Sequence, residues 1–309
     1  MIFFADIDYV DDSTTLYGRD IDSYVRTREL EYEVSENDII KTDVKLVSRR
    51  KNLTEWLISV AHHFRCCQET IYYTIDLLDR TLAAKTYKPE FLQLVGVTSF
   101  LIASKLEEYY PADIEKLCQL TEDSYTPGEV VAMEVNILSL LNFKVTINQF
   151  IFDFSPRLTK SCRLQVFGRE PMFFIRRYLN AAYSYETTEV RELAILLMDL
   201  QIPSIALWTL NTSRKAAVAV LGALLVMKFT ASSTIEDIWT PNMVYYTGYK
   251  VDALRADCMD LLQRLVEIIG EIEYCIIEKY RSQSQHHGFL RNTKVINADK
   301  VRKVIELFL

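Results

Sequence analysis

Apolar residues recur with the 3.6-residue period of a helix in one segment after another along this chain. The segment 68–84 is typical, because Ile71, Ile75, Leu78 and Leu82 fall on one face of the helix it would form. Glycine and proline, which an all-β chain needs at its many turns, number only 8 and 7 among 309 residues. The pattern therefore predicts an all-α protein with helices over 20–28, 50–64, 68–84, 89–105, 114–120, 126–141, 172–183, 190–198, 213–229, 241–247 and 250–281.

Two of these segments, 89–105 and 213–229, mix small residues with large ones, which lets neighbouring helices approach a central helix closely. The small residues are Gly96, Ala103, Ser104, Ala216, Ala217, Ala219 and Gly222. The offset between the two segments is roughly 120 residues, about one domain length, so we expect two helical domains of similar design. The expected parts are an N-terminal segment and helix at 1–34, a first domain at 35–147 that opens with a connector over 35–48, a second domain at 148–290 and a C-terminal tail at 291–309.

The charge balance and the longest apolar run exclude two classes of partner. Lysine and arginine total 35 against 42 aspartates and glutamates, a net charge of −7 without a basic tract, so we expect no binding to nucleic acid. The most apolar stretch, 216–227, is much shorter than the roughly 20 residues that a membrane span needs. We expect it to be a buried central helix, and we expect no membrane association. Six cysteines without a CxxC pair indicate reduced thiols in the cytosol or nucleus.

The sequence lacks the common motifs of catalysis and metal binding: GxGxxG, GxxxxGK[ST], GxSxG and HExxH do not occur. His62 and Cys66, and likewise His63 and Cys67, are spaced i, i+4, but each pair offers two ligands where a structural zinc site wants four. We therefore expect neither an enzyme nor a metal site. Four other cysteines lie in apolar segments and are expected in the core: Cys118, Cys162, Cys258 and Cys275.

A sharp helix start, TPGE at 126–129, matches a capping box with proline at the first helical position. On the helix that follows, Val130, Glu134, Ile137 and Leu141 form one stripe. Glu134 is thus a carboxylate in the middle of apolar residues. A buried carboxylate is costly unless it is paired and hydrogen-bonded, so its partner is of interest.

Lys105 is a second charge on an apolar helix face. In the helix expected at 89–105 it lies on the same face as Thr98, Leu101 and Ile102. Two explanations are open. In the structural one, Lys105 complements the end of its helix with its ammonium in water, and Glu134 forms an internal salt bridge. In the functional one, the two charges pair with each other and present a polar spot on an apolar surface, where a partner satisfies their remaining hydrogen-bonding capacity.

Around these two charges the sequence resembles the cyclins. Residues 92–108, LQLVGVTSFLIASKLEE, are similar to the LQLVG…ASKxEE segment of the family's first cyclin box. The resemblance covers roughly residues 17–290 and is closest to the A/B, or mitotic, class. Further similar segments are YGRDIDSYVR at 17–26, RKNLTEWL at 50–57, DRTL at 79–82, YP at 110–111, LTEDSYTPGEVVAMEVNIL at 120–138, TGY at 247–249 and EKYRS at 278–282.

The resemblance implies two five-helix cyclin-fold domains in tandem with an N-terminal helix, and a regulatory role in cell-cycle control. In that family the lysine of ASK and the glutamate of the fifth helix bind main-chain groups near the regulatory helix of a cyclin-dependent protein kinase. Here these residues are Lys105 and Glu134. The kinase supplies ATP and Mg²⁺, so the chain itself needs no cofactor, and we expect it in the nucleus and cytoplasm. The other residues matched to the kinase contact are Ile21, Tyr24, Ile102, Leu106, Leu138 and Phe143.

A second site of the family is a groove that docks substrates and inhibitors carrying an RxL motif. Its matches here are Arg49, Asn52, Leu53, Trp56, Leu92 and Gln93. Arg49 stands where the family usually has Met, and Asn52 where it usually has Ile, so the groove lacks two apolar walls. These residues are equally consistent with ordinary helix packing and with a weakened or retuned groove.

Three other interpretations are a cyclin of a transcriptional or non-cycling kinase, a cyclin-fold module of a transcription complex, and an all-α enzyme. The net charge of −7 disfavours a module that binds nucleic acid, and the missing catalytic motifs disfavour an enzyme. Mitotic cyclins usually carry a destruction box, RxxLxxxxN, before the first helix, whereas residues 1–16 contain no arginine. We therefore expect either a truncated chain or a different destruction signal, and resistance to degradation in mitotic extract.

Overall fold

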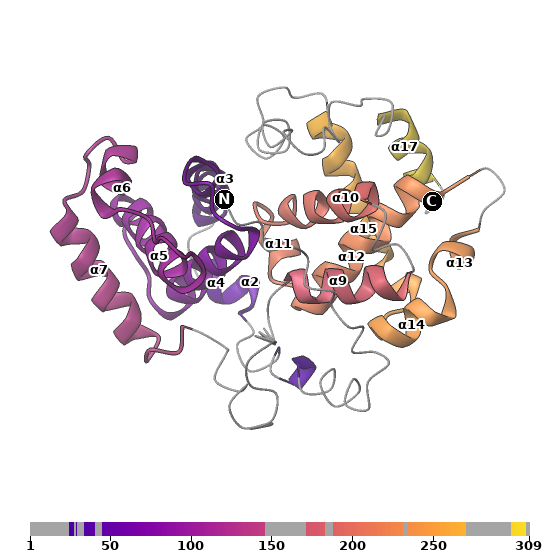
Figure 1. Cartoon of the computed structure of the whole chain (residues 1–309), viewed down its shortest axis with the longest axis horizontal. Helices are drawn as coiled ribbons and strands as arrows, with labels where there is room; N and C mark the ends of the chain where they lie inside the picture. The colour runs from indigo at the N-terminus through magenta and orange to yellow at the C-terminus, as the bar shows by residue number, and fades with distance from the viewer. Residues whose placement is uncertain are drawn as a thin grey trace.

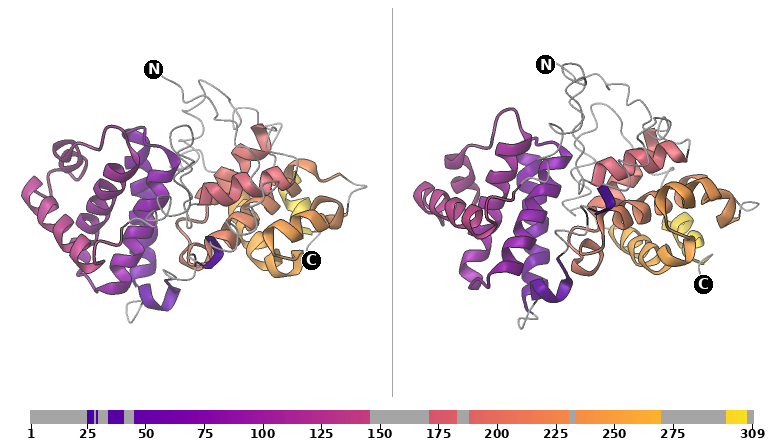
Figure 2. Two further views of the ribbon diagram at one scale, coloured as in Figure 1. Left: turned by 60° about the horizontal axis from the view of Figure 1, so that its bottom comes forward. Right: turned by 90° about the horizontal axis from the view of Figure 1, so that it is seen from below.

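The structure is a computed structural model that describes residues 25–27, 29, 34–40, 45–145, 171–182, 188–230, 234–269 and 298–306. Within these ranges every regular element is a helix, which confirms the all-α fold expected from the sequence. The helices form two lobes that lie side by side in Figure 1, and Figure 2 shows the same separation from two other directions.

The first lobe is built around one buried helix, α5 (Leu92–Glu107), against which α3, α4 and α7 pack. All residues of α5 from Leu94 to Ser104 are buried. The hydroxyls of Thr98 and Ser99 donate to carbonyl oxygens one turn earlier, so these polar side chains are satisfied in the core. The other elements of this lobe are α2 (Glu36–Ile40), α3 (Lys45–His63), α4 (Gln68–Ala84), the 3-10 helix η2 (Pro89–Phe91), α6 (Ile114–Leu120) and α7 (Pro127–Leu140).

The second lobe repeats this design around α12 (Thr212–Lys228), against which α9, α10 and α15 pack. Every residue from Lys215 to Val226 is buried, which confirms the buried central helix predicted from the apolar stretch. Among the described helices, none combines the length and the apolar character that crossing a membrane requires. The other elements of this lobe are α9 (Pro171–Ala181), α10 (Thr188–Asp199), α11 (Ile205–Trp208), α13 (Ile235–Ile238), α14 (Pro241–Thr247), α15 (Val251–Ile269) and α17 (Ala298–Glu306).

One glycine in each central helix allows a close helix contact. A Cβ atom at Gly96 would lie 3.0 Å from Leu53 Cδ1 and 3.3 Å from Leu57 Cδ1, both on α3. A Cβ atom at Gly222 would lie 3.0 Å from Leu197 Cδ1 on α10. Larger residues would push these helices apart, so the small residues noted in the sequence do mark the centre of each lobe.

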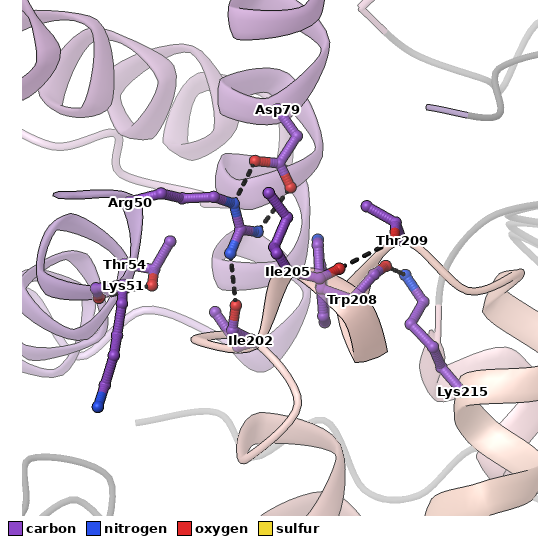
Figure 3. Close-up of polar contacts among 9 residues, drawn as sticks. All are labelled: Arg50, Lys51, Thr54, Asp79, Ile202, Ile205, Trp208, Thr209 and Lys215. Atoms are coloured by element: carbon purple, nitrogen blue, oxygen red, sulfur yellow. Dashed lines mark hydrogen bonds and ion pairs between the residues drawn. The ribbon is translucent and has the colours of Figure 1, made fainter. Parts of the chain in front are cut away.

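A buried ion pair lies where the two lobes meet (Figure 3). Arg50 of α3 makes two contacts of 2.7 Å with the carboxylate of Asp79 on α4. Its Nη1 donates to the carbonyl oxygen of Ile202, which follows α10, at 2.9 Å. Beside this contact the ring of Tyr72 packs against that of Trp208, with centroids 6.0 Å apart. The lobes are therefore joined by polar and aromatic contacts between residues far apart in the sequence.

The segment 35–48, expected to be a connector, is instead largely helical, since it holds α2 and the start of α3. The carboxylate of Asp38 accepts hydrogen bonds from the Ser35 amide and hydroxyl, and the Ser35 hydroxyl accepts one from the Asp38 amide. This reciprocal cap starts α2, and Ile39, 1% exposed, anchors it in the core. A helix of one turn has too few residues to show a period, which is why the sequence did not indicate it.

The tail expected at 291–309 likewise contains a helix, α17, which packs against α15 and α12. Its anchors Val301 and Val304 are both 0% exposed. Of the helices expected at 20–28 and 250–281, residues 25–27 and 251–269 are helical and Lys250 lies just before the second helix, while their remaining residues lie outside the described part of the chain. The four-residue helices α11 and α13 were not expected.

Candidate partner-binding surface

Lys105 and Glu134 meet on the outer side of the first lobe. Lys105 lies in the last turn of α5 and Glu134 in the middle of α7, which forms the edge of this lobe in Figure 1. The Nζ atom of Lys105 lies 2.7 Å and 2.8 Å from the two carboxylate oxygens of Glu134. The Lys105 side chain is 43% exposed and that of Glu134 is 15% exposed. The two charges noted in the sequence are therefore paired with each other, with the ammonium group at the surface.

The start of α7 sets the direction in which Glu134 points. The Thr126 hydroxyl accepts the amide of Glu129 at 3.3 Å, and the Glu129 carboxylate accepts the amide of Thr126 at 2.8 Å. This is the capping box predicted from TPGE. From that start, Val130 and Ile137 turn into the core, where they are 1% and 0% exposed. Glu134 lies between them on the same stripe of α7. Its carboxylate therefore faces the end of α5, where Lys105 lies.

Apolar side chains close to the ion pair in sequence, on α5, on α7 and in the turn after α7, are exposed to solvent. Val131, Val135 and Phe143 are 45%, 59% and 69% exposed, and Leu106 is 38% exposed. Leu138 is half-buried. Single exposed apolar residues are ordinary, but a group of them marks an interaction site. We call this surface the α5–α7 face; it consists of Lys105, Leu106, Val131, Glu134, Val135, Leu138 and Phe143.

The sequence found some members of this face and missed others. Ile102, matched to the kinase contact, is 3% exposed and lies beneath the surface as part of the core. Ile21 and Tyr24, also matched to it, lie outside the described residues. Val131 and Val135 were missed; the available signal was two β-branched residues four positions apart, just off the buried stripe of α7.

A strained turn at the end of α7 exposes Phe143. Asn142 and Phe143 have φ angles of 52° and 57°, in the left-handed region that costs a residue other than glycine about 1–2 kcal/mol. The amide of Phe143 donates to the carbonyl oxygen of Leu138 at 2.8 Å. Arg80 donates to the carbonyl oxygen of Lys144, which holds the turn from the other side. Backbone strain that presents an aromatic side chain to water is typical of a functional site.

Glu107 and Glu108, which follow Lys105 in sequence, are both partly buried. Glu108 accepts a hydrogen bond of 2.6 Å from the Thr70 hydroxyl, which ties the end of α5 to the start of α4. Arg176 of α9 lies 3.2 Å from Glu69 and links the two lobes. Burial, together with the nearby charges of Glu69 and Glu108, raises the pKa of Glu107 to about 7. This carboxyl group therefore titrates near neutral pH.

The residues matched to the docking groove lie together on α3 and the start of α5. Leu53 and Leu92 are nearly buried, at 9% and 6% exposed. Asn52 is exposed. Three further matched residues are half-buried: Arg49, Trp56 and Gln93. The two departures from the family, Arg49 and Asn52, are thus at least partly accessible to solvent, and peptide binding stays a prediction.

The described residues offer little for chemistry. Among them, no group of three or more His, Cys, Asp and Glu side chains is placed to hold a metal ion. Burial raises the pKa of the Cys66 thiol, and it raises the pKa of Cys67 to about 12, so both are protonated at neutral pH and poor nucleophiles. Cys118 and Cys258 are buried, as expected for core residues. Two cysteines lie outside the described residues: Cys162 and Cys275.

Comparison with known proteins gives a consistent result. Residues 20–146 match the family model "Cyclin, N-terminal domain", and residues 170–291 match "Cyclin, C-terminal domain". Cyclin-A1-4 of Oryza sativa subsp. japonica is 32% identical over 273 residues, which cover 86% of this chain and 68% of that protein. The G2/mitotic-specific cyclin-B of Arbacia punctulata is 30% identical over 280 residues, which cover 90% of this chain.

The chain spans only 61% of the length of the Arbacia protein and 57% of the G2/mitotic-specific cyclin-A of Hydra viridissima. A solved structure supports the fold: a viral cyclin from Herpesvirus saimiri superposes with a TM-score of 0.62 at 18% identity, covering 80% of this chain and 97% of that one. Both family models, the relatives and the tandem helical lobes agree: this chain belongs to the cyclin family.

Proposed function

We propose that this chain is a regulatory subunit that binds a cyclin-dependent protein kinase and activates it allosterically in cell-cycle control. The observation that carries the proposal is the Lys105–Glu134 ion pair, half-exposed within the apolar α5–α7 face. Apolar area gives such an interface its free energy, and a few charged groups near its centre give it specificity.

The ion pair leaves hydrogen-bonding capacity for a partner. A lysine ammonium has three donors, and the two contacts with Glu134 use two of them. Each carboxylate oxygen of Glu134 has a second lone pair. The pair therefore presents one donor and several acceptors in a fixed position, which suits main-chain groups at the end of a partner's helix or loop.

Activation follows if the kinase meets this face better in its active conformation than in its inactive one. A kinase is active when its regulatory helix lies inward, so that a glutamate on that helix pairs with the lysine that binds ATP, and when its activation loop is open. A rigid face built on α5 and α7 supports the inward position of such a helix. The chemistry, with ATP and Mg²⁺, belongs to the kinase.

The relatives refine the proposal. Those named above are A- and B-type cyclins, two of them described as G2/mitotic-specific. We place the chain in the mitotic class on this similarity, and we expect it in the nucleus and cytoplasm. Docking of RxL substrates or inhibitors on α3 is a second, weaker proposal, because Arg49 and Asn52 alter the groove.

The experiment is purification of a tagged chain from native lysate, followed by a kinase assay on histone substrate. We expect the wild-type chain to bring down kinase activity. The double variant Lys105→Ala with Glu134→Ala should lose it, since loss of charge-assisted bonds at an interface costs about 2–5 kcal/mol. The control is Arg264→Ala with Asp260→Ala, which removes an exposed ion pair of α15 in the second lobe. Unchanged kinase recovery by a folded Lys105/Glu134 double variant would show that this pair is not the contact.

A further inference from the structure

Two charged residues of the N-terminal segment reach the second lobe. Arg26 and Glu29 precede the first lobe in sequence, and their spacing of three places both on one side of a helix. Val25 beside them is 0% exposed. Both charged side chains form hydrogen bonds with residues between 178 and 249, in the second lobe.

Glu29 caps the start of α12. One carboxylate oxygen accepts the amide of Ser213 at 2.5 Å, and the other accepts the Ser213 hydroxyl at 2.8 Å. The residue at the cap position of α12, Asn211, forms no capping hydrogen bond with its own side chain. Glu29 is only 5% exposed, so its side chain is committed to this contact. Burial raises the pKa of this carboxyl group, and the two hydrogen bonds from Ser213 oppose that shift because they favour the charged form. A residue more than 180 positions away thus supplies the cap that α12 lacks.

Arg26 closes the end of α14. Its guanidinium donates to the carbonyl oxygen of Thr247 at 2.7 Å and to that of Tyr246 at 3.3 Å. It also lies 5.9 Å from the centre of the Tyr249 ring. The chain turns away from α14 at Gly248, where φ is 73°, and a Cβ atom there would lie 3.7 Å from the guanidinium. That distance is an ordinary van der Waals contact, so the positive φ, not the space, is what favours glycine where Arg26 meets the last carbonyls of the helix.

Each charge matches the helix end it contacts, because a helix is partly positive at its start and partly negative at its end. We propose that Arg26 and Glu29 are positioning residues, which hold the N-terminal segment on the second lobe by capping α14 and α12, and so hold it ready for the kinase. The second half of this statement rests on the proposed function. A segment ordered in advance does not lose conformational entropy on binding, so loosening the clamp should weaken kinase binding about tenfold.

The first test needs no kinase. Hydrogen exchange of the Ser213 amide, resolved by fragmentation or NMR, should be faster by about tenfold or more in Glu29→Ala, because the acceptor of that amide is lost. Glu29→Gln keeps an acceptor oxygen and should retain most of the protection. Glu267→Ala, an exposed glutamate of α15, is the matched control and should leave exchange unchanged. Wild-type exchange at Ser213 in Glu29→Ala would overturn the clamp.

The second test measures kinase affinity of the same variants together with Arg26→Ala. We expect weaker binding in Arg26→Ala and Glu29→Ala, at a melting temperature that still indicates a folded chain, and recovery in Glu29→Gln. Faster exchange with unchanged affinity would overturn the positioning role. A wild-type chain that binds no kinase would instead overturn the proposed function, while the exchange result would still decide the clamp. If Glu29→Ala does not fold, Glu29→Asp, whose shorter side chain withdraws the acceptor from the Ser213 amide, takes its place in both tests.

Discussion

Arg50 and Asp79 form a two-point ion pair in the interior of the protein, with Nε and Nη2 each 2.7 Å from one carboxylate oxygen. The Arg50 side chain is 0% exposed and that of Asp79 is 6% exposed. The remaining contact of Arg50, with the carbonyl oxygen of Ile202, extends the pair to the second lobe. A buried pair adds little compared with well-packed apolar residues, but one member left alone is strongly destabilising.

Asp79→Ala should therefore lower the free energy of unfolding by about 3–5 kcal/mol, because Arg50 would remain buried without its counter-ion. Arg50→Met with Asp79→Leu should cost less than the sum of the single changes. Urea unfolding followed by circular dichroism measures both. The control Arg264→Ala removes an exposed ion pair and should cost under about 1 kcal/mol. A loss as small as the control's in Asp79→Ala would mean that the pair does not stabilise the fold.

Phe143→Gly should change stability and binding in opposite directions. Glycine adopts the left-handed backbone freely, so the strain at φ 57° is relieved and stability should rise by about 1 kcal/mol. Kinase affinity should fall about tenfold or more, because an exposed aromatic side chain of the α5–α7 face is lost. Thermal unfolding and a binding titration measure the two effects.

Asn142→Gly is the matched control for that variant. It relaxes the neighbouring residue at φ 52° and leaves the aromatic ring in place. Its gain in stability should be smaller, since asparagine tolerates this conformation, and its kinase affinity should equal that of the wild type. Equal affinity of Phe143→Gly and Asn142→Gly would remove Phe143 from the contact.

Long helices were predictable from the sequence because their apolar faces repeat over several turns, as in α4 and α12. The short ones were not. Helix α2 depends on a reciprocal cap between Ser35 and Asp38 and on one anchor, Ile39, and α17 depends on two valines. Such helices are stabilised by tertiary packing, which a periodicity of one or two turns does not show.

The charged centre of the candidate site was predictable for a different reason. Lys105 and Glu134 break the apolar pattern of their helices, so the sequence alone distinguishes them from their neighbours. Val131 and Val135 fit the pattern of a helix, and only the packing of α7 shows that they face water. The exposure of Phe143 depends on a backbone conformation that the sequence Asn-Phe does not require.

Glu107→Gln should stabilise the protein at high pH and have little effect at low pH. Burial and nearby carboxylates raise the pKa of Glu107 in the fold from 4.5 to about 7. Below about pH 4.5 the group is protonated in both states. Stability is lost as pH rises from there to about 7, because the unfolded state releases this proton at a lower pH than the folded state does. Melting temperatures at pH 5 and pH 8 test this. Glu267→Gln, at an exposed site on α15, should show no such pH dependence.

Replacing Arg49 and Asn52 should restore a weakened docking groove. An RxL peptide would seat its leucine against Leu53, Trp56 and Leu92, of which Leu53 and Leu92 are nearly buried. Arg49 brings a cation to the rim, where it repels the arginine of the peptide, and Asn52 brings an amide where an apolar wall is wanted. Loss of one packed aliphatic wall costs about 1–3 kcal/mol.

Affinity of the wild-type chain for ordinary RxL peptides should therefore be about ten- to a hundredfold below that of Arg49→Met with Asn52→Ile. Fluorescence polarisation with a labelled peptide measures the difference. Lys51→Met is the control. Lys51 is exposed on the opposite side of α3, so this variant introduces a methionine away from the groove residues. The control should bind as weakly as the wild type. Tight binding of the peptide by the unmodified chain would contradict this prediction. It would show that Arg49 and Asn52 do not weaken the groove.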